Sequence, residues 1–500
     1  MSPQQTPIRD TERVQPGHFE PPAHYYPRTL NAQIHPLVRA FMRLGNDRVA
    51  ARYVHLHPEV DPASIRAALA HRPRHFRWGG ADLFHVATAE GVRRIVVIET
   101  NSCPSGQKSM PLIDDGDEHG GYRRLIEGAF LPMLKRRGLP QGGLAVIYDK
   151  NYTEASGYAA AMADATGEPV HLVPCFASDP DLPLRVTDGV IHFRDAEGAW
   201  RPIRAALRYV TQRPWSRIPP ITRTALMNPV VVCLAGGRNK MLGAKAYDLH
   251  NARLRDSGLM IRTPETIWDV SLEEVPLWVT RLGGVAVVKV PYSNAGQGVY
   301  TLTSREELEA FMALPHRYDR FIVQALIGNH AWSSRGVAEH LYHVGTIPDR
   351  HNHIYVSDLR VMVGVGVEGF FPTALYARRA RTPLQKQPPQ AYDHTSWSVL
   401  GTNLSVKLGD DQWASESERL LLMDSRDFNR LGLGVDDLVE AYVQTVLSVS
   451  AIDHMACDLI NAKGRFRARY FKALNPDPAL SAEILLPPKP ITGGTPAPLS

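Results

Sequence analysis

A lysine inside an apolar strand is the feature that most constrains how this chain folds. Residues 285 to 304 read VAVVKVPYSNAGQGVYTLTS, which predicts a strand, a loop of small residues and glycine, and a second strand. Because the flanking valines predict burial, Lys289 needs an anionic partner, since an unpaired buried ammonium costs several kcal/mol. The alternative is a β-hairpin with a glycine turn and a lysine that reaches solvent.

The loop after this lysine has the composition of a flexible cover for phosphate. Its residues are small or glycine, so their backbone N–H groups meet little side-chain obstruction. Such a loop suits a lid over phosphate oxygens, and with the strand lysine it indicates nucleoside triphosphate chemistry. The predicted cofactor contacts are Ser293, Asn294, Gly296, Gln297 and Gly298.

A second lysine occupies a matching position earlier in the chain. Lys240 follows a predicted strand and a glycine turn in LAGGRNK. As compact point charges, Lys240 and Lys289 would hold an oxygen cluster from two sides. Downstream, RFIVQALIG predicts an apolar strand whose backbone pairs with an adenine edge, although a plain core strand explains that segment equally well. The predicted adenine contacts are Gln324, Ala325, Leu326 and Ile327.

Other common nucleotide and metal motifs are excluded by pattern or context. GxxxxGK[ST] does not occur in the sequence, which excludes a P-loop. GxGxxG occurs at Gly364–Gly369, but FFPTALYARR follows it instead of a helix start, so we predict a hairpin turn. The histidines between His330 and His353 match no zinc pattern.

One arginine has the setting of an anion clamp. Asp358 and Arg360 are two residues apart on a predicted strand, so their side chains point to the same face. Arg360 would hold a carboxylate or a phosphoryl group with its planar fork, and it is the predicted catalytic residue. The alternative is a surface ion pair between neighbouring strands.

Carboxylate and amide side chains predict two alternative magnesium sites. Mg²⁺ takes hard oxygen ligands and keeps phosphates as the others. The first candidate joins Glu99 and Asn101, at the end of the strand IVVIE, with Asp82. The second joins Asp458 with Asn475. A carboxylate must offset the metal charge, and an alanine stands two residues before Asn475, so we favour the first candidate.

Whole-chain composition limits the class of protein. The 56 lysines and arginines exceed the 51 acidic residues by five, too few to predict nucleic-acid binding. We find no apolar run of about 18 residues and no export leader, so no membrane partner is expected. Four scattered cysteines without a CxxC pair favour a reducing cytoplasm.

Local patterns predict the main elements. LAVIYD, an alanine-rich helix and PVHLVPC form a strand–helix–strand unit of Rossmann-like type, and VIHFRD with WRPI predicts a hairpin. NPVVVC predicts a buried strand before the glycine turn of LAGGRNK. Residues 397–407 and the segment DLINAKGRFRARYFKALNP are predicted as strands, with helices from about 415 to 452.

The chain resembles the ATP-grasp family from about residue 75 to 475. LAGGRNK, VVKVPYSNAGQGV, FIVQALI, DLRVMV and GTNLSV occur in the family's order. IVVIETNSCPSG is similar to the metal-binding Glu-x-Asn of circularly permuted members, glutathione synthetase of eukaryotes and glutathionylspermidine synthetase. ACDLINAKGRFRARYFKALNPDP resembles the terminal metal motif of unpermuted peptide ligases. The resemblance implies ATP phosphates on Lys240 and Lys289 and an acyl phosphate near Arg360.

The resemblance implies an α/β fold in which two α+β subdomains close on ATP and Mg²⁺, after a Rossmann-like domain. The expected boundaries follow the motifs and the proline-rich ends. They are 1–30 for an N-terminal arm, 31–225 for the N-terminal region with the Rossmann-like domain, 226–325 for the subdomain with the glycine flap, 326–483 for the second subdomain with a helical extension, and 484–500 for a disordered tail.

Most family members activate a carboxylate as an acyl phosphate and pass it to an amine or thiol. We therefore expect an ATP-dependent ligase that joins a small-molecule acid, such as an amino acid or small peptide, to an amine. The alternatives are a substrate kinase of the same fold and a binding or scaffold protein without catalysis. A homo-oligomer is compatible with the sequence, and the substrates are not readable because distant residues assemble the pocket.

Overall fold

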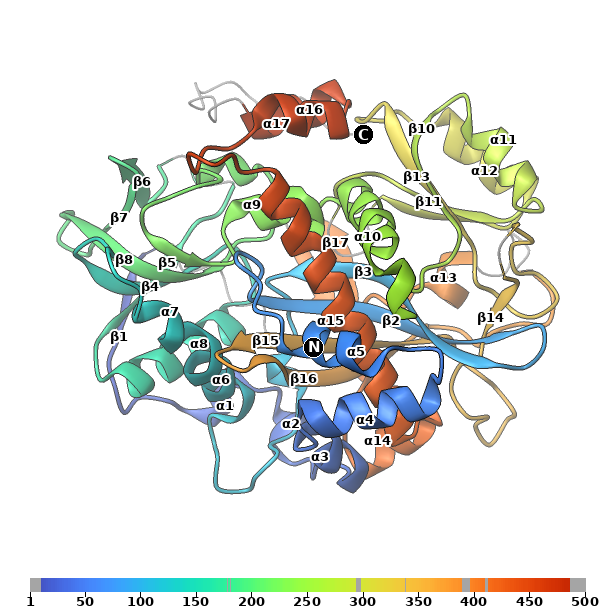
Figure 1. The fold of residues 1–500 in the computed structure, drawn as a ribbon, viewed down its shortest axis with the longest axis horizontal. Coiled ribbons are helices and arrows are strands. Elements are labelled where there is room, and N and C mark those ends of the chain that lie inside the picture. The colour runs from blue at the N-terminus through green and yellow to red at the C-terminus, as the bar shows by residue number, and fades with distance from the viewer. Residues whose placement is uncertain are drawn as a thin grey trace.

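The chain forms a mixed α/β structure built on three larger sheets (Figure 1). The computed structural model describes residues 10–485 except 178, 180, 294–297, 338, 389–395 and 410–411, and only the backbone of 405–409, 412–415 and 484–485. None of the described helices combines the length and the hydropathy that crossing a membrane requires.

The first sheet contains the predicted strand–helix–strand unit. β4 (Gly143–Tyr148) and β5 (Val170–Pro174) are parallel and are joined by α8 (Tyr152–Thr166), which confirms that prediction. β8 (Trp200–Tyr209) runs parallel on the other side of β4 and forms the predicted hairpin with β7 (Val190–Arg194). The remaining strands are β1 (Glu12–Val14) from the predicted arm, β6 (Leu184–Thr187) and β9 (Ala225–Met227).

The second sheet lies at the centre of the molecule and is antiparallel. β2 (Trp78–Thr88) pairs with both β3 (Arg93–Ser102) and β15 (Ser357–Gly366), and β15 pairs with β16 (Gly369–Arg379). The turn of the β15–β16 hairpin contains the GxGxxG motif, as predicted. The outer strands are β14 (Leu341–His343) and β19 (Leu420–Leu421).

A long helix covers the central sheet. α15 (Val435–Asp458) crosses in front of β2, β3 and β15 in Figure 1 and contacts all three. The approach is close because Gly79 has no side chain, and a Cβ there would lie 2.7 Å from a methyl of Val449. Other helices of this layer are α3 (Pro36–Met42), α4 (Asn46–Leu56), α5 (Pro62–Ala70), α10 (Lys240–Leu254) and α14 (Ser425–Leu431).

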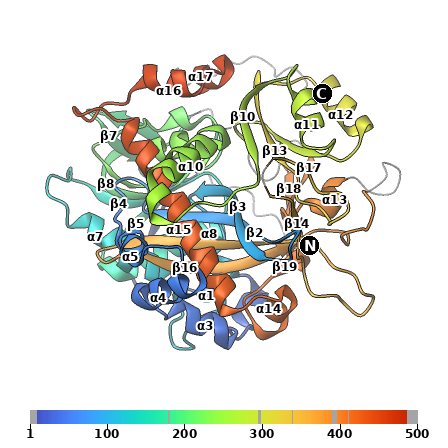
Figure 2. The same cartoon turned by 45° about the vertical axis from the view of Figure 1, so that its right-hand side comes forward.

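The third sheet forms a smaller unit with its own apolar core. It is antiparallel in the order β10 (Thr266–Ser271), β13 (Arg320–Ala325), β11 (Ala286–Lys289), β12 (Val299–Leu302), with α11 (Val275–Arg281) and α12 (Arg305–Ala313). Ser304 caps α12 through the N–H of Glu307. Figure 2 shows this unit beside the central sheet and on the side away from the first sheet.

Three strand predictions are wrong. VVVC is helical, as α9 (Val230–Val232) and a π-turn (Cys233–Gly237), because an apolar run buried on all sides has no period that separates strand from helix. Residues 396–400 form α13 (Ser396–Leu400), so strand begins only at β17 (Ser405–Gly409), which pairs with β18 (Gln412–Ser415). The segment after α15 has one isolated bridge, followed by α16 (Ala468–Leu474) and α17 (Pro478–Leu485).

The remaining helices are short, and one of them lies close to the C-terminal end of the described chain. α17 includes the first two residues of the predicted tail, and 486–500 lie outside the described residues. The connecting helices are α1 (Pro21–His24), α2 (Pro27–Leu30), α6 (Gly120–Leu125) and α7 (Leu131–Leu134).

Candidate active site

A cavity of about 550 Å³ lies where the three sheets meet. Its lining comes from β2, β3, β15 and β16 of the central sheet, from β11, β12 and β13 of the small unit, and from the loops after β4 and β8. Part of the lining is apolar and suits a planar aromatic ring such as a nucleobase. These apolar residues include Phe84, Ile98, Val287, Val299, Leu326, Ile327 and Leu400.

Lys289 is the last residue of β11 and is 5% exposed. Its Nζ donates to Oε1 of Gln324 at 2.7 Å and reaches the carbonyl of Ile98 at 3.5 Å. Within the described part of the chain no carboxylate lies at ion-pair distance from it, so both partners are neutral. Burial lowers the pKa of Lys289 to about 8, against an opposing effect of Glu99. The predicted anionic partner is therefore not supplied at contact distance by the described protein.

Lys240 begins α10, whose cap is the side chain of Asn239. Its Nζ donates to the hydroxyl of Ser293 at 3.1 Å and to the carbonyl of that residue at 3.2 Å, and lies 3.5 Å from Glu99. The lysine thus contacts the start of the predicted flap. Gly298 closes the same loop in the left-handed region at φ +65°, and its carbonyl accepts from Val290. Asn294, Gly296 and Gln297 lie outside the described residues.

The predicted adenine segment also lines the cavity. Gln324, Ala325, Leu326 and Ile327 all contribute to its wall. Part of their backbone is already paired, because Leu326 accepts from the N–H of Ser334 and donates to its hydroxyl.

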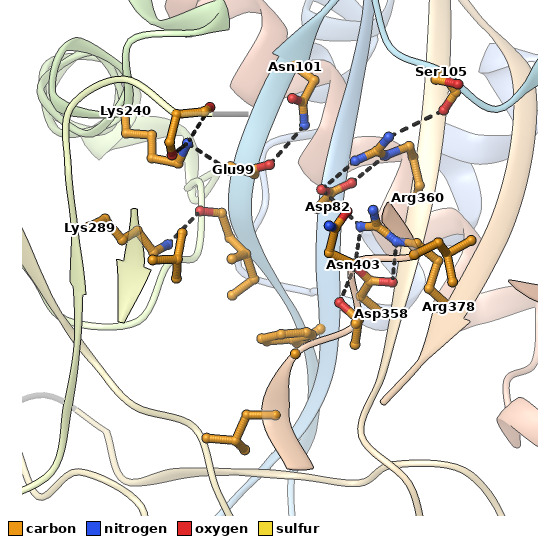
Figure 3. Close-up of a pocket in the computed structure, with 18 of the residues that line it drawn as sticks. Asp82, Glu99, Asn101, Ser105, Lys240, Lys289, Asp358, Arg360, Arg378 and Asn403 are labelled. Atoms are coloured by element: carbon orange, nitrogen blue, oxygen red, sulfur yellow. Dashed lines mark hydrogen bonds and ion pairs between the residues drawn. The ribbon is translucent and has the colours of Figure 1, made fainter. Parts of the chain in front are cut away.

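Glu99 and Asn101 lie between the lysines and the arginines of the cavity (Figure 3). Asn101 donates to Oε1 of Glu99 at 3.3 Å and accepts from Arg238 at 3.2 Å. Burial acts to raise the pKa of Glu99, but Lys240 and neighbouring cations outweigh it, so the pKa falls below its usual range. Glu99 is therefore a carboxylate over the whole neutral range.

Four charged residues form what we call the arginine network, namely Asp82, Asp358, Arg360 and Arg378. Asp82 stands opposite Arg360 across β2 and β15, and Asp358 stands opposite Arg378 across β15 and β16. Arg360 grips both oxygens of Asp82, at 2.5 and 2.6 Å. Arg378 contacts Asp82 at 3.0 Å and also pairs with Asp358. The alternative prediction is a surface ion pair between neighbouring strands. Arg360 does pair with Asp82 on the neighbouring strand, but the pair is buried, so the surface assignment is wrong.

The network is anchored to a neighbouring loop. Arg360 Nη1 donates to the carbonyl of Ser105 at 3.3 Å, and the hydroxyl of Tyr376 donates to the same oxygen at 2.8 Å. Burial opposes the charge of Arg360, but Asp82 outweighs it and raises the arginine pKa. Both oxygens of Asp82 are engaged by guanidinium groups, which leaves Glu99 and Asn101 as the better placed of the predicted magnesium ligands.

The second predicted metal pair lies elsewhere. Asp458 ends α15, its side chain is 43% exposed, and it pairs with Arg253 at 3.4 Å. Asn475 is fully buried after α16, and neither residue lines the cavity. The described residues contain no cluster of three metal-ligating His, Cys, Asp or Glu side chains. The magnesium assignment stays a prediction.

Sequence analysis missed several charged residues of the cavity. Lys150 follows β4, where the carboxyl end of a parallel strand is a usual ligand position, so the strand prediction carried a usable signal. Arg238 belongs to the LAGGRNK motif beside Lys240. Lys108 carried no local signal, because its placement depends on packing between distant segments.

No protein-family model and no curated protein sequence matches the chain. Solved structures that it matches include a glutathione synthetase-like effector from Globodera pallida, at 8% identity and TM-score 0.38, over 68% of this chain and 83% of that one. Another is a RimK domain ATP-grasp protein from Sphaerobacter thermophilus, at 16% identity and TM-score 0.28, over 46% and 89%. A third is an N5-carboxyaminoimidazole ribonucleotide synthetase in complex with ADP, at 11% identity and TM-score 0.21, over 52% and 76%. All three TM-scores lie below 0.5.

Proposed function

We propose that the protein is an ATP-dependent carboxylate–amine ligase that works through an acyl phosphate. The observation that carries the proposal is the buried Lys289, whose hydrogen-bond partners among the described residues are neutral and which faces a cavity shared with Lys240 and Glu99. A polyphosphate would supply the missing negative charge to Lys289 and a further anionic partner to Lys240, which already lies 3.5 Å from Glu99. The apolar wall next to Lys289 would contact the adenine ring of ATP. The order of motifs resembling ATP-grasp enzymes points the same way.

The residues at the centre of the cavity fit a magnesium ion. Glu99 supplies a carboxylate oxygen and Asn101 an amide oxygen, which are hard ligands in the small number that Mg²⁺ takes when phosphates complete its shell. Bound there, the ion would neutralise phosphate charge. Lys240 and Lys289 would hold the phosphates in position beside it.

The chemical steps balance without a further reagent. A carboxylate oxygen of the acid attacks the γ-phosphorus and ADP leaves, which gives an acyl phosphate. The amine nitrogen then attacks the acyl carbon, phosphate leaves, and the nitrogen loses a proton. Arg360 would stabilise charge on the acyl phosphate from a position that Asp82 and Ser105 hold rigid.

An ADP-release screen with mass detection tests this function. Purified protein is incubated with ATP, Mg²⁺ and pairs of amino acids or small peptides. We expect ADP release that requires both an acid and an amine, with an amide product of the summed mass minus water. ADP release with acid alone and a phosphorylated product would instead identify a kinase. Failure of calorimetry to detect ATP binding would contradict the proposal.

A further inference from the structure

The end of the cavity nearest the first sheet is lined by three cations that we call the basic end, namely Lys108, Lys150 and Arg238. Lys108 lies in a short 3-10 turn (Gln107–Ser109), Lys150 follows β4, and Arg238 precedes α10. Three segments far apart in the sequence therefore bring positive charge to one wall.

None of these cations has a carboxylate at ion-pair distance within the described part of the chain. Lys108 donates to the amide oxygen of Asn151 at 3.1 Å and lies over the ring of Tyr26. Arg238 donates to the backbone carbonyls of Ser102 and Cys103 and to the side-chain oxygen of Asn101. Their partners are neutral, and the positive charge of this wall is not cancelled locally.

Two carboxylates that act on the charge of Lys150, namely Glu154 and Asp149, are engaged by other donors. Glu154 accepts from the N–H groups of Gly106 and Gln107 at 2.9 and 2.8 Å. Asp149 accepts from the N–H groups of Thr211 and Gln212 at 2.9 and 2.6 Å. Both carboxylates thus shape the loops around the cavity, and among the described residues neither forms an ion pair with the basic end, although both favour the charged form of Lys150.

The basic end is distinct from the lysines assigned to ATP. Ser105 joins it to the arginine network, because the amide of Asn151 donates to the Ser105 hydroxyl at 2.8 Å and Arg360 donates to the Ser105 carbonyl. In Figure 3, Ser105 and Arg360 lie on the opposite side of Glu99 from Lys240 and Lys289. A molecule at the basic end would approach the γ-phosphate from the arginine side.

We propose that the basic end binds a second carboxylate of the acid substrate, so that the substrate is a small acid with two carboxylates, of which one reacts. The statement that one of the two carboxylates reacts rests on the proposed function. The anion-binding site itself is inferred from the three cations, which have no carboxylate at ion-pair distance among the described residues. A single carboxylate reacting near Arg360 would leave Lys150, Arg238 and Lys108 without a counter-charge. A second carboxylate provides it through charge-assisted hydrogen bonds.

The electrostatics of Lys150 agree with an anion at this place. Burial, and next Arg238, lower the pKa of Lys150 to about 7. A bound carboxylate would favour the charged form, so binding near pH 8 should be accompanied by proton uptake. Calorimetry in buffers of different ionisation enthalpy measures that uptake directly.

The test compares matched ligands without ATP. Binding of succinate and glutarate is measured by calorimetry and thermal shift beside succinamate and glutaramate, which keep the size but lose one carboxylate. We expect the diacids to bind at least about tenfold tighter than the monoamides, the usual value of a charged hydrogen bond. Equal affinities, or binding of inorganic phosphate alone, would overturn the proposal.

Variants locate the binding. Lys150→Gln and Arg238→Gln should each lose about tenfold or more in diacid affinity, whereas Lys135→Gln and Arg137→Gln, at exposed positions, should bind like the wild type. Lys150→Gln should fold with an unchanged or higher Tm, because it removes a buried cation that forms no ion pair with any carboxylate of the described residues. Wild-type diacid affinity in both cavity variants would overturn the site.

The same samples separate the two proposals. ATP binding is measured on the Lys150→Gln protein, which should retain it within about twofold if Lys240 and Lys289 hold the phosphates. Diacid binding that depends on Lys150, in a protein that does not bind ATP, would support the anion site and remove the ligase function. ATP binding without diacid binding would be consistent with the ligase function and would overturn the proposed anion site.

Discussion

The small unit and the central sheet treat buried charge in opposite ways. In the small unit, Lys289 is held by an amide and a carbonyl, and its pKa falls to about 8. In the central sheet, Arg360 and Arg378 are matched by Asp82 and Asp358 across neighbouring strands. The paired charges stabilise the fold and hold Arg360 in a fixed position at the cavity. Burying the unpaired charge of Lys289 costs free energy in the ligand-free protein. A ligand of opposite charge would offset that cost when it binds.

The largest expected effect comes from breaking the paired side. Asp82→Asn removes the carboxylate that two buried guanidinium groups share, so Arg360 loses its main counter-charge and Arg378 keeps only Asp358. We expect the free energy of unfolding to fall by about 3–5 kcal/mol, measured by urea denaturation. Asp458→Asn, at a half-exposed ion pair, serves as the control and should change it by less than about 1 kcal/mol. A loss at Asp82 no larger than that of the control would show that the network does not support the fold.

Breaking the unpaired side should leave the fold intact and remove binding. Lys289→Met keeps the length of the side chain and removes its charge. We expect ATP affinity to fall at least about 100-fold, measured by calorimetry, with a Tm equal to or above that of the wild type. Wild-type nucleotide affinity would refute the inference drawn from the buried lysine, and a large loss of Tm would place Lys289 with the structural charges.

Glu99 lies on β3 of the central sheet and contacts Lys240, and its substitution tests which end of the chain holds the metal. Glu99→Gln keeps the shape and the contact with Asn101 but removes the carboxylate. The Mg²⁺ concentration needed for half-maximal ATP binding should rise about tenfold. Asp458→Asn and a variant at the buried Asn475, Asn475→Asp, should leave this requirement unchanged. A larger shift in either of them would move the predicted metal to the far end of the chain.

The smallest effect is a dependence on pH that only the unpaired side should show. Free Lys289 titrates at about 8, and phosphate contact raises its pKa, so the charged form binds. ATP affinity should therefore be steady below pH 7 and fall about fourfold between pH 7 and 8.5. The Lys289→Met protein should show no such fall. The same shift makes folding more favourable as pH rises from about 8 to 10.4, since the unfolded lysine binds more protons in that window.

The sequence by itself determined the local features of this protein. The lysine within VVKV, the turn at Gly364–Gly369 and the parallel strand–helix–strand unit all follow from patterns within short segments. Such patterns fail where burial is complete, as in VVVC, because an all-apolar segment has no period to read. The helical form of residues 468–474 was missed for a similar reason, since alternating aromatic and basic residues also suit a strand.

Only the tertiary structure decided which charges meet. Asp82 and Arg360 are 278 residues apart and face each other because β2 and β15 are neighbours in one sheet. Lys240 reaches Glu99 because α10 begins beside the end of β3. Strand order and register depend on how much apolar surface each face of a sheet buries. That buried area depends on contacts throughout the molecule and not on any short segment. A residue's type and its neighbours in sequence therefore reveal that a charge needs a partner, while packing determines whether protein or ligand provides it.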